Sequence, residues 1–232
     1  MDYMEQLSER EKHISYTYTI YGDELMNRFK RNQLRKQEDI THILDRAKAS
    51  GINLLKYQHY DETKSEEMDE IYYQNAFIYI PRYIEEFSKI IRNSPPLKRP
   101  IRVFRGIKDG EYIKKHLVRY GNKNAYFHNI DFLSSSIFVP PAAGFTGDSC
   151  CMLEITIHPS VRCMFTAYLS KRRYEYEITI EPDTYLDIHK IQYKLVLDSY
   201  EQHEDMDVFI HPAKHEVRKI VTVSSTLTKI QP

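Results

Sequence analysis

The chain has 232 residues, of which 41% are hydrophobic and 28% are charged. These proportions are typical of a folded globular protein and exclude a disordered or fibrous chain. Lysine plus arginine equals aspartate plus glutamate, at 33 each, so no net charge draws the molecule towards nucleic acid or an acidic membrane. We therefore expect a single globular domain, residues 1–232, with nucleic acid disfavoured as a partner.

Membrane insertion and secretion are also disfavoured. No stretch approaches the roughly 18 apolar residues of a spanning helix, and the N-terminal MDYMEQLSEREKH is too polar for a signal peptide. The cysteines Cys150, Cys151 and Cys163 are odd in number and lack a metal-type spacing. We predict free, buried thiols and a cytoplasmic location, where thiols stay reduced.

The first hundred residues show helical patterns. Between Gln37 and Gly51, apolar residues recur at helical spacing, with Asp39 near the start and Gly51 as a stop. A second helix is expected from about Ser65 to Tyr79. A third is expected to begin at Pro81, since the first turn of a helix does not need the missing N–H; its apolar face holds Ile84, Phe87 and Ile91.

The Pro-rich stretch from Ser94 to Pro100 ends this helical part, and patterns typical of strands follow it. The strands are expected at Ile101–Arg105, Cys151–His158, Tyr174–Ile180, Ile191–Leu197 and Val217–Val223. Helices (1–100) followed by strands (101–232) indicate an α+β fold. The seven glycines form neither G-x-G-x-x-G nor a P-loop, so a dinucleotide would not be bound in a Rossmann manner.

Two carboxylates stand out in the strand predicted at 174–180. Alternation places Glu175 and Glu177 on one face and Tyr176, Ile178 and Ile180 on the other. Neighbouring like charges raise each other's pKa, which suits acid–base chemistry or stabilisation of a cation. For an isolated E-x-E, a solvated strand face remains the default interpretation.

Two other short motifs are weak when taken alone. Ser134, Ser135 and Ser136 lie between apolar residues at the edge of a predicted strand, where serines are often part of a turn. Arg105 and Gly106 end an apolar strand with a guanidinium and a residue that allows close backbone approach, which suits phosphate binding. A surface arginine is the commoner explanation.

The order and spacing of the three motifs resemble the ADP-ribosyltransferase superfamily of bacterial toxins, phage and viral enzymes and vertebrate ecto-transferases. In its arginine–serine–glutamate class, an aromatic-Arg-Gly strand precedes Phe-x-Ser-x-Ser and then Glu-x-Glu. The resemblance covers roughly Pro81 to Ile188 and includes Phe145, CMLEITIHPS and YEYEITIEPDTYLDI. It implies N-terminal helices followed by two packed, mainly antiparallel β-sheets.

Two positions depart from the family pattern. Ser135 replaces the usual threonine of Ser-Thr-Ser, and Asp183 stands where the family has a glycine after the glutamate strand. Neither departure removes a catalytic group.

The resemblance implies an enzyme that transfers ADP-ribose from NAD to a protein and releases nicotinamide. Glu177 would stabilise the positive charge that develops on the ribose, and Ser134 would orient that glutamate. Arg105 would hold a phosphate and Gly106 the carboxamide, while Phe145 would stack near nicotinamide. Ser136 would complete the NAD site. No metal is expected.

The type of residue that is modified in the acceptor protein is predicted from Glu175. A glutamate at this position is usual in relatives that modify arginine, because a carboxylate can pair with a guanidinium and help to deprotonate it. Tyr168 and Tyr174 would contact the target protein, together with the basic run Lys171–Arg173. A solvated basic loop is an equal alternative for that run. The protein would act in its own cytosol or, as an effector or viral protein, in a host cell.

Three alternatives remain open or weakly supported. The chain could be an NAD glycohydrolase, in which water accepts the ADP-ribose, or a catalytically silent binding module of the same fold. A metal site at His211 and His215 is disfavoured, because Pro212 interrupts the helix that such a pair needs and no third ligand is evident.

Overall fold

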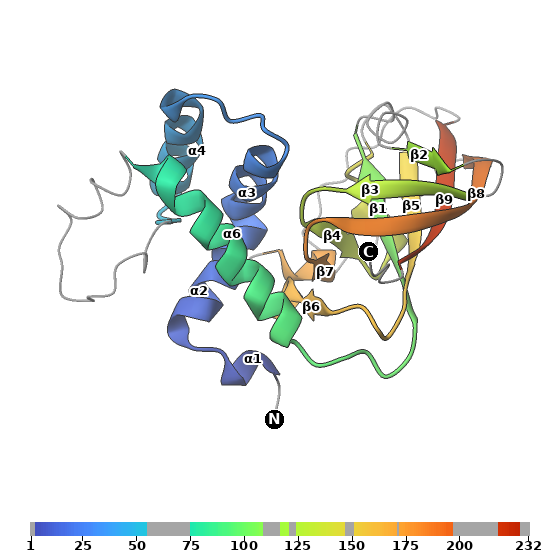
Figure 1. Cartoon of the computed structure of the whole chain (residues 1–232), viewed down its shortest axis with the longest axis horizontal. Helices are drawn as coiled ribbons and strands as arrows, with labels where there is room; N and C mark the ends of the chain where they lie inside the picture. Colours follow the sequence, from blue (N-terminus) through green and yellow to red (C-terminus); the bar gives the residue numbers. More distant parts are fainter. Residues whose placement is uncertain are drawn as a thin grey trace, which may run out of the picture.

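The computed structural model describes residues 3–54, 75–108, 117–120, 124–146, 151–170, 172–196 and 218–227. N-terminal helices form one half of the molecule and strands form the other, side by side (Figure 1). The α+β class expected from the sequence is confirmed. No helix among the described residues is long and apolar enough to cross a membrane.

Six helical segments make up the N-terminal half in the described part of the chain. They are α1 (Tyr3–Gln6), α2 (Glu9–Thr17), η1 (Tyr18–Gly22), α3 (Asp23–Lys30), α4 (Gln37–Ala49) and α6 (Ala76–Asn93). Helix α4 confirms the first helix prediction, and Gly51 follows it with φ of 74°, a left-handed conformation that glycine adopts without steric cost. Residues 65–74 of the second predicted helix lie outside the described residues, and 76–79 belong to α6.

Helix α6 begins five residues earlier than the sequence predicted. Pro81 lies inside the helix instead of at its first position. The buried side chains of Ala76 and Ile80 extend the apolar face of α6 upstream, and this packing outweighs the single backbone hydrogen bond that a proline removes. The predicted face is confirmed, since Ile84, Phe87 and Ile91 are buried.

A π-helical turn, η1, interrupts the path from α2 to α3. Thr17, the last residue of α2, donates its hydroxyl back to His13 O at 2.8 Å and Ile14 O at 3.1 Å, a pattern that favours bending. A π-turn shifts the register of the helix that follows it and is frequent at functional sites. In this protein the π-turn buries Tyr18 in the core and places Thr19 and Ile20 at a cleft between the two halves of the molecule.

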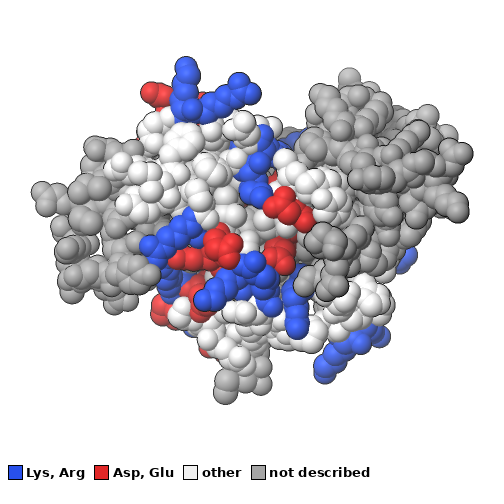
Figure 2. All heavy atoms as spheres, viewed as in Figure 1, with Lys and Arg blue, Asp and Glu red and all other residues white. Residues whose placement is uncertain are grey.

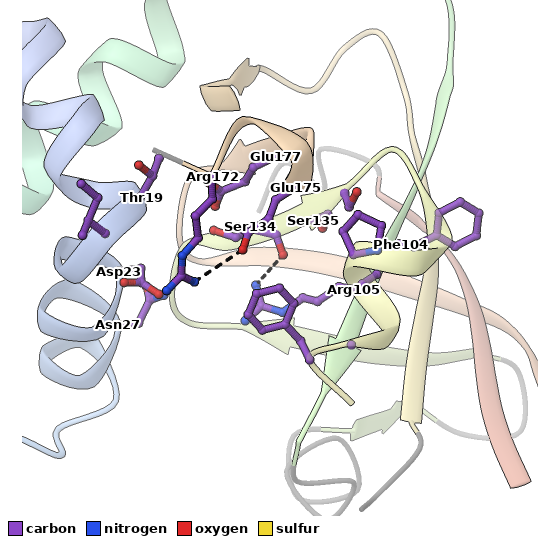
Figure 3. Close-up of a pocket in the computed structure, with 16 residues that line it drawn as sticks. Thr19, Asp23, Asn27, Phe104, Arg105, Ser134, Ser135, Arg172, Glu175 and Glu177 are labelled. Carbon is purple, nitrogen blue, oxygen red and sulfur yellow. Dashed lines mark hydrogen bonds and ion pairs between the residues drawn. The ribbon is translucent and has the colours of Figure 1, made fainter. Parts of the chain in front are cut away.

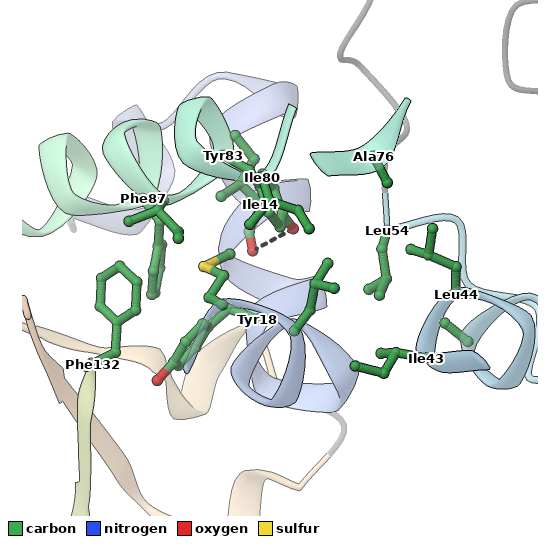
Figure 4. Close-up of a cluster of buried hydrophobic side chains, with 14 of the residues drawn as sticks. Ile14, Tyr18, Ile43, Leu44, Leu54, Ala76, Ile80, Tyr83, Phe87 and Phe132 are labelled. Atoms are coloured by element: carbon green, nitrogen blue, oxygen red, sulfur yellow. Dashed lines mark hydrogen bonds between the residues drawn. The ribbon is translucent and has the colours of Figure 1, made fainter. Parts of the chain in front are cut away.

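An aromatic cluster joins the two halves of the molecule. Tyr18 stacks on Phe87 with ring centroids 4.3 Å apart, and it meets Phe132 of the strand half edge-on at 5.3 Å (Figure 4). All three rings are fully buried. Burial of side chains of this size contributes roughly 1.5–3 kcal/mol each, so the helical core fixes the segment of the strand half that contains Phe132.

The strands form one hydrogen-bonded order, β2-β3-β8-β9-β5-β1-β4-β7-β6. Their bounds are β1 (Ile101–Ile107), β2 (Leu117–Tyr120), β3 (Asn124–Asn129), β4 (Leu133–Ser136), β5 (Cys151–Ile157), β6 (Cys163–Phe165), β7 (Glu177–Ile180), β8 (Thr184–Val196) and β9 (Arg218–Leu227). Among the described strands, all pairs are antiparallel except β5 with β9.

The order divides into a larger part, β2-β3-β8-β9-β5-β1, and a smaller part, β4-β7-β6. The two parts meet at β1 and β4 through one aligned pair, Phe104 with Ser136, whereas β1 and β5 align along all seven residues of β1. A junction this short lets the smaller part turn away from the larger one, and the two parts correspond to the two sheets that the sequence predicted.

The predicted strands are found with shifted ends. The strand expected at 191–197 begins already at Thr184, and the one expected at 217–223 is observed from Arg218 to Leu227. Cys151 and Cys163 are free and buried, as expected, while Cys150 lies outside the described residues. Among the described residues, the strand core packs around Val103, Leu153 and Ile155 of β1 and β5.

Candidate active site

An open cleft lies between the helical half and strands β1, β4 and β7 (Figure 3). It encloses about 770 Å³ of space, part of it continuous with bulk solvent. Seven residues singled out in the sequence line it: Arg105, Gly106, Ser134, Ser136, Phe145, Glu175 and Glu177. On the described part of the face shown in Figure 2, acidic and basic side chains lie next to one another, so that face has no extended surface of a single sign.

Three neighbouring strands bring the motif residues together. Arg105 lies on β1, Ser134 on β4 and Glu177 at the start of β7, and β4 pairs with both of the other strands. Ser134 faces Thr179, and Ser136 faces Glu177, in the β4–β7 register. Residues about thirty and forty positions apart in sequence thus converge because adjacent strands carry them.

The guanidinium of Arg105 is fixed by the backbone of β4. Its Nη1 donates to Ser134 O at 3.2 Å (Figure 3) and to Phe132 O, just before β4, at 3.3 Å. Both bonds use one terminal nitrogen, and a guanidinium has five N–H donors. The remaining donors suit an anion in the cleft, and the positive charge of Arg105 lowers the pKa of Glu177, as expected for groups that lie near each other.

Glu177 is the most enclosed carboxylate of the motif. Burial raises its pKa above the ordinary value, hydrogen bonding from Ser134 opposes this rise, and the charge of Glu175 adds to it. The backbone carbonyl of Glu177 also accepts from Thr166 Oγ1 at 3.3 Å. A carboxylate held by hydroxyls in a partly desolvated site can interact strongly with a developing cation.

Gly106 is required by the close packing of helix α8 (Val139–Ala143) against β1. A Cβ at this position would lie 2.1 Å from Ala142 O and 2.8 Å from Thr146 N, which is inside van der Waals contact. Phe145 follows α8 and keeps 41% of its surface exposed at the cleft. Because Gly106 has no side chain, α8 and Phe145 can pack closely against β1, the strand that carries Arg105.

Solved structures of ADP-ribosyltransferase toxins are similar to this chain in fold. The toxin Plx2a from Paenibacillus larvae aligns with a TM-score of 0.53 at 15% identity, over 97% of this chain and 89% of its own. The enzymatic component C2-I of the Clostridium botulinum C2 toxin gives 0.60 at 13% identity, over 100% of this chain and 45% of C2-I. The Salmonella SpvB ATR domain gives 0.56 at 15% identity, over 95% of this chain and 100% of that domain.

The chain has the ADP-ribosyltransferase fold. No protein-family model matches the sequence, and no curated protein sequence matches it. At 13% and 15% identity, the likeness establishes the fold, and the chemistry of this chain has to be argued from its own cleft.

One prediction about the E-x-E segment is wrong. Glu175 lies in a short 3-10 helix, η4 (Arg173–Glu175), and only Glu177 is on a strand. Tyr176 between them has φ of 47° and is 41% exposed, so it does not point to the core. Its ring instead meets Phe138 edge-on at 4.7 Å. The left-handed residue breaks the period of two, yet both glutamates still line the cleft.

Asp183, which departs from the family pattern, has an unusual backbone conformation. Asp183 has φ of 57°, a left-handed conformation that glycine adopts readily and that aspartate tolerates better than most residues. Its carboxylate pairs with Lys30 Nζ at 2.6 Å. Asp183 thus adopts a backbone conformation that suits glycine, and its side chain ties the turn between β7 and β8 to helix α3.

The three serines occupy strand β4 itself instead of a turn at its edge. Ser134 Oγ lies 2.8 Å from the hydroxyl of Tyr18. Ser136 is buried, and its Oγ accepts a hydrogen bond from Phe138 N at 3.0 Å, which holds the chain at the start of α8. Ser136 lines the cleft, but its hydroxyl already has a structural role, so its contact with NAD stays a prediction.

The N-terminal helices contribute residues to the cleft that the sequence did not predict. Thr19, Ile20, Asp23 and Asn27 line the cleft opposite the strands, and Asn27 Oδ1 accepts from Phe132 N at 2.9 Å. No motif marks these residues, since their placement depends on the π-turn and on packing between distant segments. The fold alone brings them to the site.

Asp23 is the most perturbed of these residues. The pKa of Asp23 is raised from 3.8 to about 7. The main cause is loss of hydration among the atoms of the cleft, and the second is the negative charge of Glu177. Asp23 is nevertheless exposed to solvent, because the cleft is open, and solvent screening weakens its interaction with Glu177. Neutralisation of Asp23 thus relieves repulsion among the three carboxylates that line the cleft, those of Asp23, Glu175 and Glu177.

The remaining predicted residues lie at the rim or outside the described chain. Tyr168 and Tyr174 are 60% and 46% exposed, and neither lines the cleft, so their contact with a target protein stays a prediction. Lys171, His211 and His215 lie outside the described residues. Within the described ranges, no three histidine, cysteine, aspartate or glutamate side chains are grouped as a metal site.

Proposed function

We propose that this chain is an NAD-dependent mono-ADP-ribosyltransferase that modifies arginine in a protein acceptor. The observation that carries the proposal is the convergence of Arg105, Ser134 and Glu177 from three adjacent strands on one cleft. The cleft fits NAD chemically, because it offers a guanidinium for a phosphate, close glycine backbone at Gly106 and an exposed ring at Phe145. Metal is not needed in this scheme.

Glu177 is assigned the central role. Breaking the bond between nicotinamide and ribose builds positive charge on the ribose ring, as in glycoside hydrolysis. A carboxylate that is already positioned and partly desolvated stabilises this charge more than it stabilises bound NAD, and only such a difference accelerates the step. Ser134 keeps the carboxylate in place, and Tyr18 in turn holds Ser134.

Arg105 and Gly106 are assigned to binding and orientation of NAD. The two hydrogen bonds from Arg105 to the carbonyls of Phe132 and Ser134 fix its side chain before NAD arrives, which lowers the entropy cost of binding. Gly106 allows the backbone to approach the nicotinamide carboxamide. Both roles position the leaving group relative to Glu177.

Glu175 is assigned to the acceptor. It lies at the cleft near Glu177, and it already pairs with a guanidinium, that of Arg172, with Nη1–Oε1 of 3.4 Å. Burial raises the pKa of Glu175, and the nearby Arg172 lowers it. Pairing with Arg172 supports the assignment, because an acceptor arginine would bind through the same kind of ion pair, and a carboxylate there can accept its proton.

The test is incubation of the purified protein with NAD labelled in the adenosine half, in the presence of a cell lysate or of the small guanidine agmatine. Label on protein arginine or on agmatine supports the proposal. Free ADP-ribose as the main product supports an NAD glycohydrolase instead, and unchanged NAD supports a silent binding module. Label mapped by mass spectrometry to cysteine or a nucleobase contradicts the role given to Glu175.

A Glu175→Gln variant sharpens the acceptor assignment. Because Glu177 remains, release of nicotinamide from NAD should continue, while transfer to agmatine should fall by at least about tenfold as the proton acceptor is lost. Equal loss of both reactions would place Glu175 in the NAD step and not in acceptor chemistry.

A further inference from the structure

Arg172 occupies the position that the proposed function gives to an acceptor arginine. Its guanidinium lies 3.4 Å from the Glu175 carboxylate and lines the same cleft as Glu177. In Figure 3 the side chain extends from the η4 side of the cleft towards Asp23 on helix α3. Its positive charge lowers the pKa of both Asp23 and Glu175, as expected for a group that lies between them.

The backbone around Arg172 is well fixed. Arg172 N donates to Ser170 Oγ at 2.9 Å, and Arg172 O accepts from Glu175 N at 2.9 Å. The side chain itself keeps 51% of its surface exposed, whereas Glu175 keeps 16%. An arginine held at its base and open at its tip can be reached by a second reactant in the cleft.

We propose that Arg172 is a self-ADP-ribosylation site, modified by NAD bound in the cleft of the same molecule. This inference rests on the proposed function. In the step, the bond between ribose C1′ and the nicotinamide nitrogen breaks, and nicotinamide leaves as a neutral molecule with that electron pair. A guanidinium nitrogen of Arg172 forms the new bond to C1′ and loses one proton, which Glu175 accepts and passes to solvent.

The geometry favours transfer within one molecule over transfer between molecules. A group tethered beside the reacting bond has a far higher effective concentration than a separate chain in dilute solution. The adjacent Arg173 provides a natural comparison, because it is also exposed but does not line the cleft. We therefore expect modification of Arg172 and not of Arg173.

The experiment uses the purified full chain with labelled NAD and no added acceptor, over a range of protein concentrations. Peptide mapping should place ADP-ribose on Arg172, with a rate constant independent of protein concentration. Arg173→Lys should keep the label on Arg172, and Arg172→Lys should lose it. In a mixture of untagged wild type and tagged Glu177→Gln, the tagged chain should remain unlabelled, because it cannot modify its own Arg172.

Agmatine in a parallel reaction separates the two proposals. If agmatine is labelled but Arg172 is not, or if the tagged Glu177→Gln chain becomes labelled, self-modification within one molecule is wrong and the proposed function stands. If NAD stays intact with agmatine and with protein alone, the proposed function fails, and this inference fails with it.

Discussion

The hydroxyl of Tyr18, in the helical half, lies 2.8 Å from Oγ of Ser134, on the central strand of the site. Tyr18 is fully buried, and its ring stacks on Phe87. Burial raises the pKa of Tyr18 far above its ordinary value, and the negative charge of Glu177 raises it further. Tyr18 therefore remains a neutral hydroxyl. Through this contact the N-terminal helices take part in positioning the serine that holds Glu177.

Replacing Tyr18 by phenylalanine should therefore lower activity by more than the accompanying loss of stability can explain. Tyr18→Phe removes one hydrogen bond, worth about 1 kcal/mol, and leaves Ser134 less well oriented; we expect kcat/KM for ADP-ribose transfer to fall by about three- to tenfold. Tyr83→Phe is the matched control, because Tyr83 is equally buried and its hydroxyl pairs with Thr17 away from the cleft. An equal loss of activity in both variants would show that only general stability is affected.

Gly106 should not tolerate a methyl group. In Gly106→Ala the new Cβ meets the backbone of α8 at Ala142 O, and neither strand nor helix can move freely, so we expect a loss of about 1–3 kcal/mol in unfolding free energy and weaker NAD binding. Gly144→Ala is the control, since its Cβ would be in ordinary contact at 3.4 Å. Urea unfolding and calorimetric titration with NAD measure both effects, and wild-type values for Gly106→Ala would contradict the packing described.

Asp183 offers a test of backbone conformation at the departure from the family pattern. Asp183→Gly removes the cost of a left-handed residue but also the pairing with Lys30, an exposed interaction worth at most about 1 kcal/mol, so stability should change little. Asp183→Ala loses the pairing and keeps the strain, and it should be less stable than the glycine variant by about 1 kcal/mol. Thermal unfolding of both variants tests this prediction. An alanine variant as stable as the glycine variant would refute the explanation by backbone strain at position 183.

Asp23 should make stability depend on pH. Its pKa in the folded protein, about 7, is above the ordinary 3.8, so the folded state binds the proton more tightly than the unfolded chain does. The free energy of unfolding should therefore decrease as pH rises from about 4 to about 7 and stay reduced above that range. Asp23→Asn should be more stable than wild type at pH 8, with the difference vanishing near pH 4.

Glu38→Gln is a suitable control for that experiment, because it removes an exposed carboxylate of α4 far from the cleft with the same change of charge. Denaturant unfolding at several pH values gives the comparison. If Asp23→Asn and Glu38→Gln show the same pH profile, Asp23 does not bear the predicted shift.

Local sequence patterns were sufficient for much of the fold. Helix α4 follows from its apolar spacing and Gly51, and β1 and β5 follow from their β-type composition and alternation. The ends of elements were less accurate, as with Pro81 in α6, because burial of upstream residues such as Ile80 decides where a helix begins.

The site was only partly accessible to the same reasoning. Motif order and spacing indicated Arg105, Ser134 and Glu177, which lie together as expected. The alternation rule misplaced Glu175, because Tyr176 is left-handed and interrupts the strand. Asp23 carries no local signal, since its environment is created by strands more than a hundred residues away in sequence.

The most direct test of the central claim compares wild type with Glu177→Gln in two assays, release of nicotinamide from NAD and binding of NAD by calorimetry. Because Glu177 is assigned to stabilising the charge that appears only as the bond breaks, the variant should lose nicotinamide release by at least about 10²-fold, with an NAD dissociation constant close to that of wild type. Release at the wild-type rate by Glu177→Gln would contradict the account.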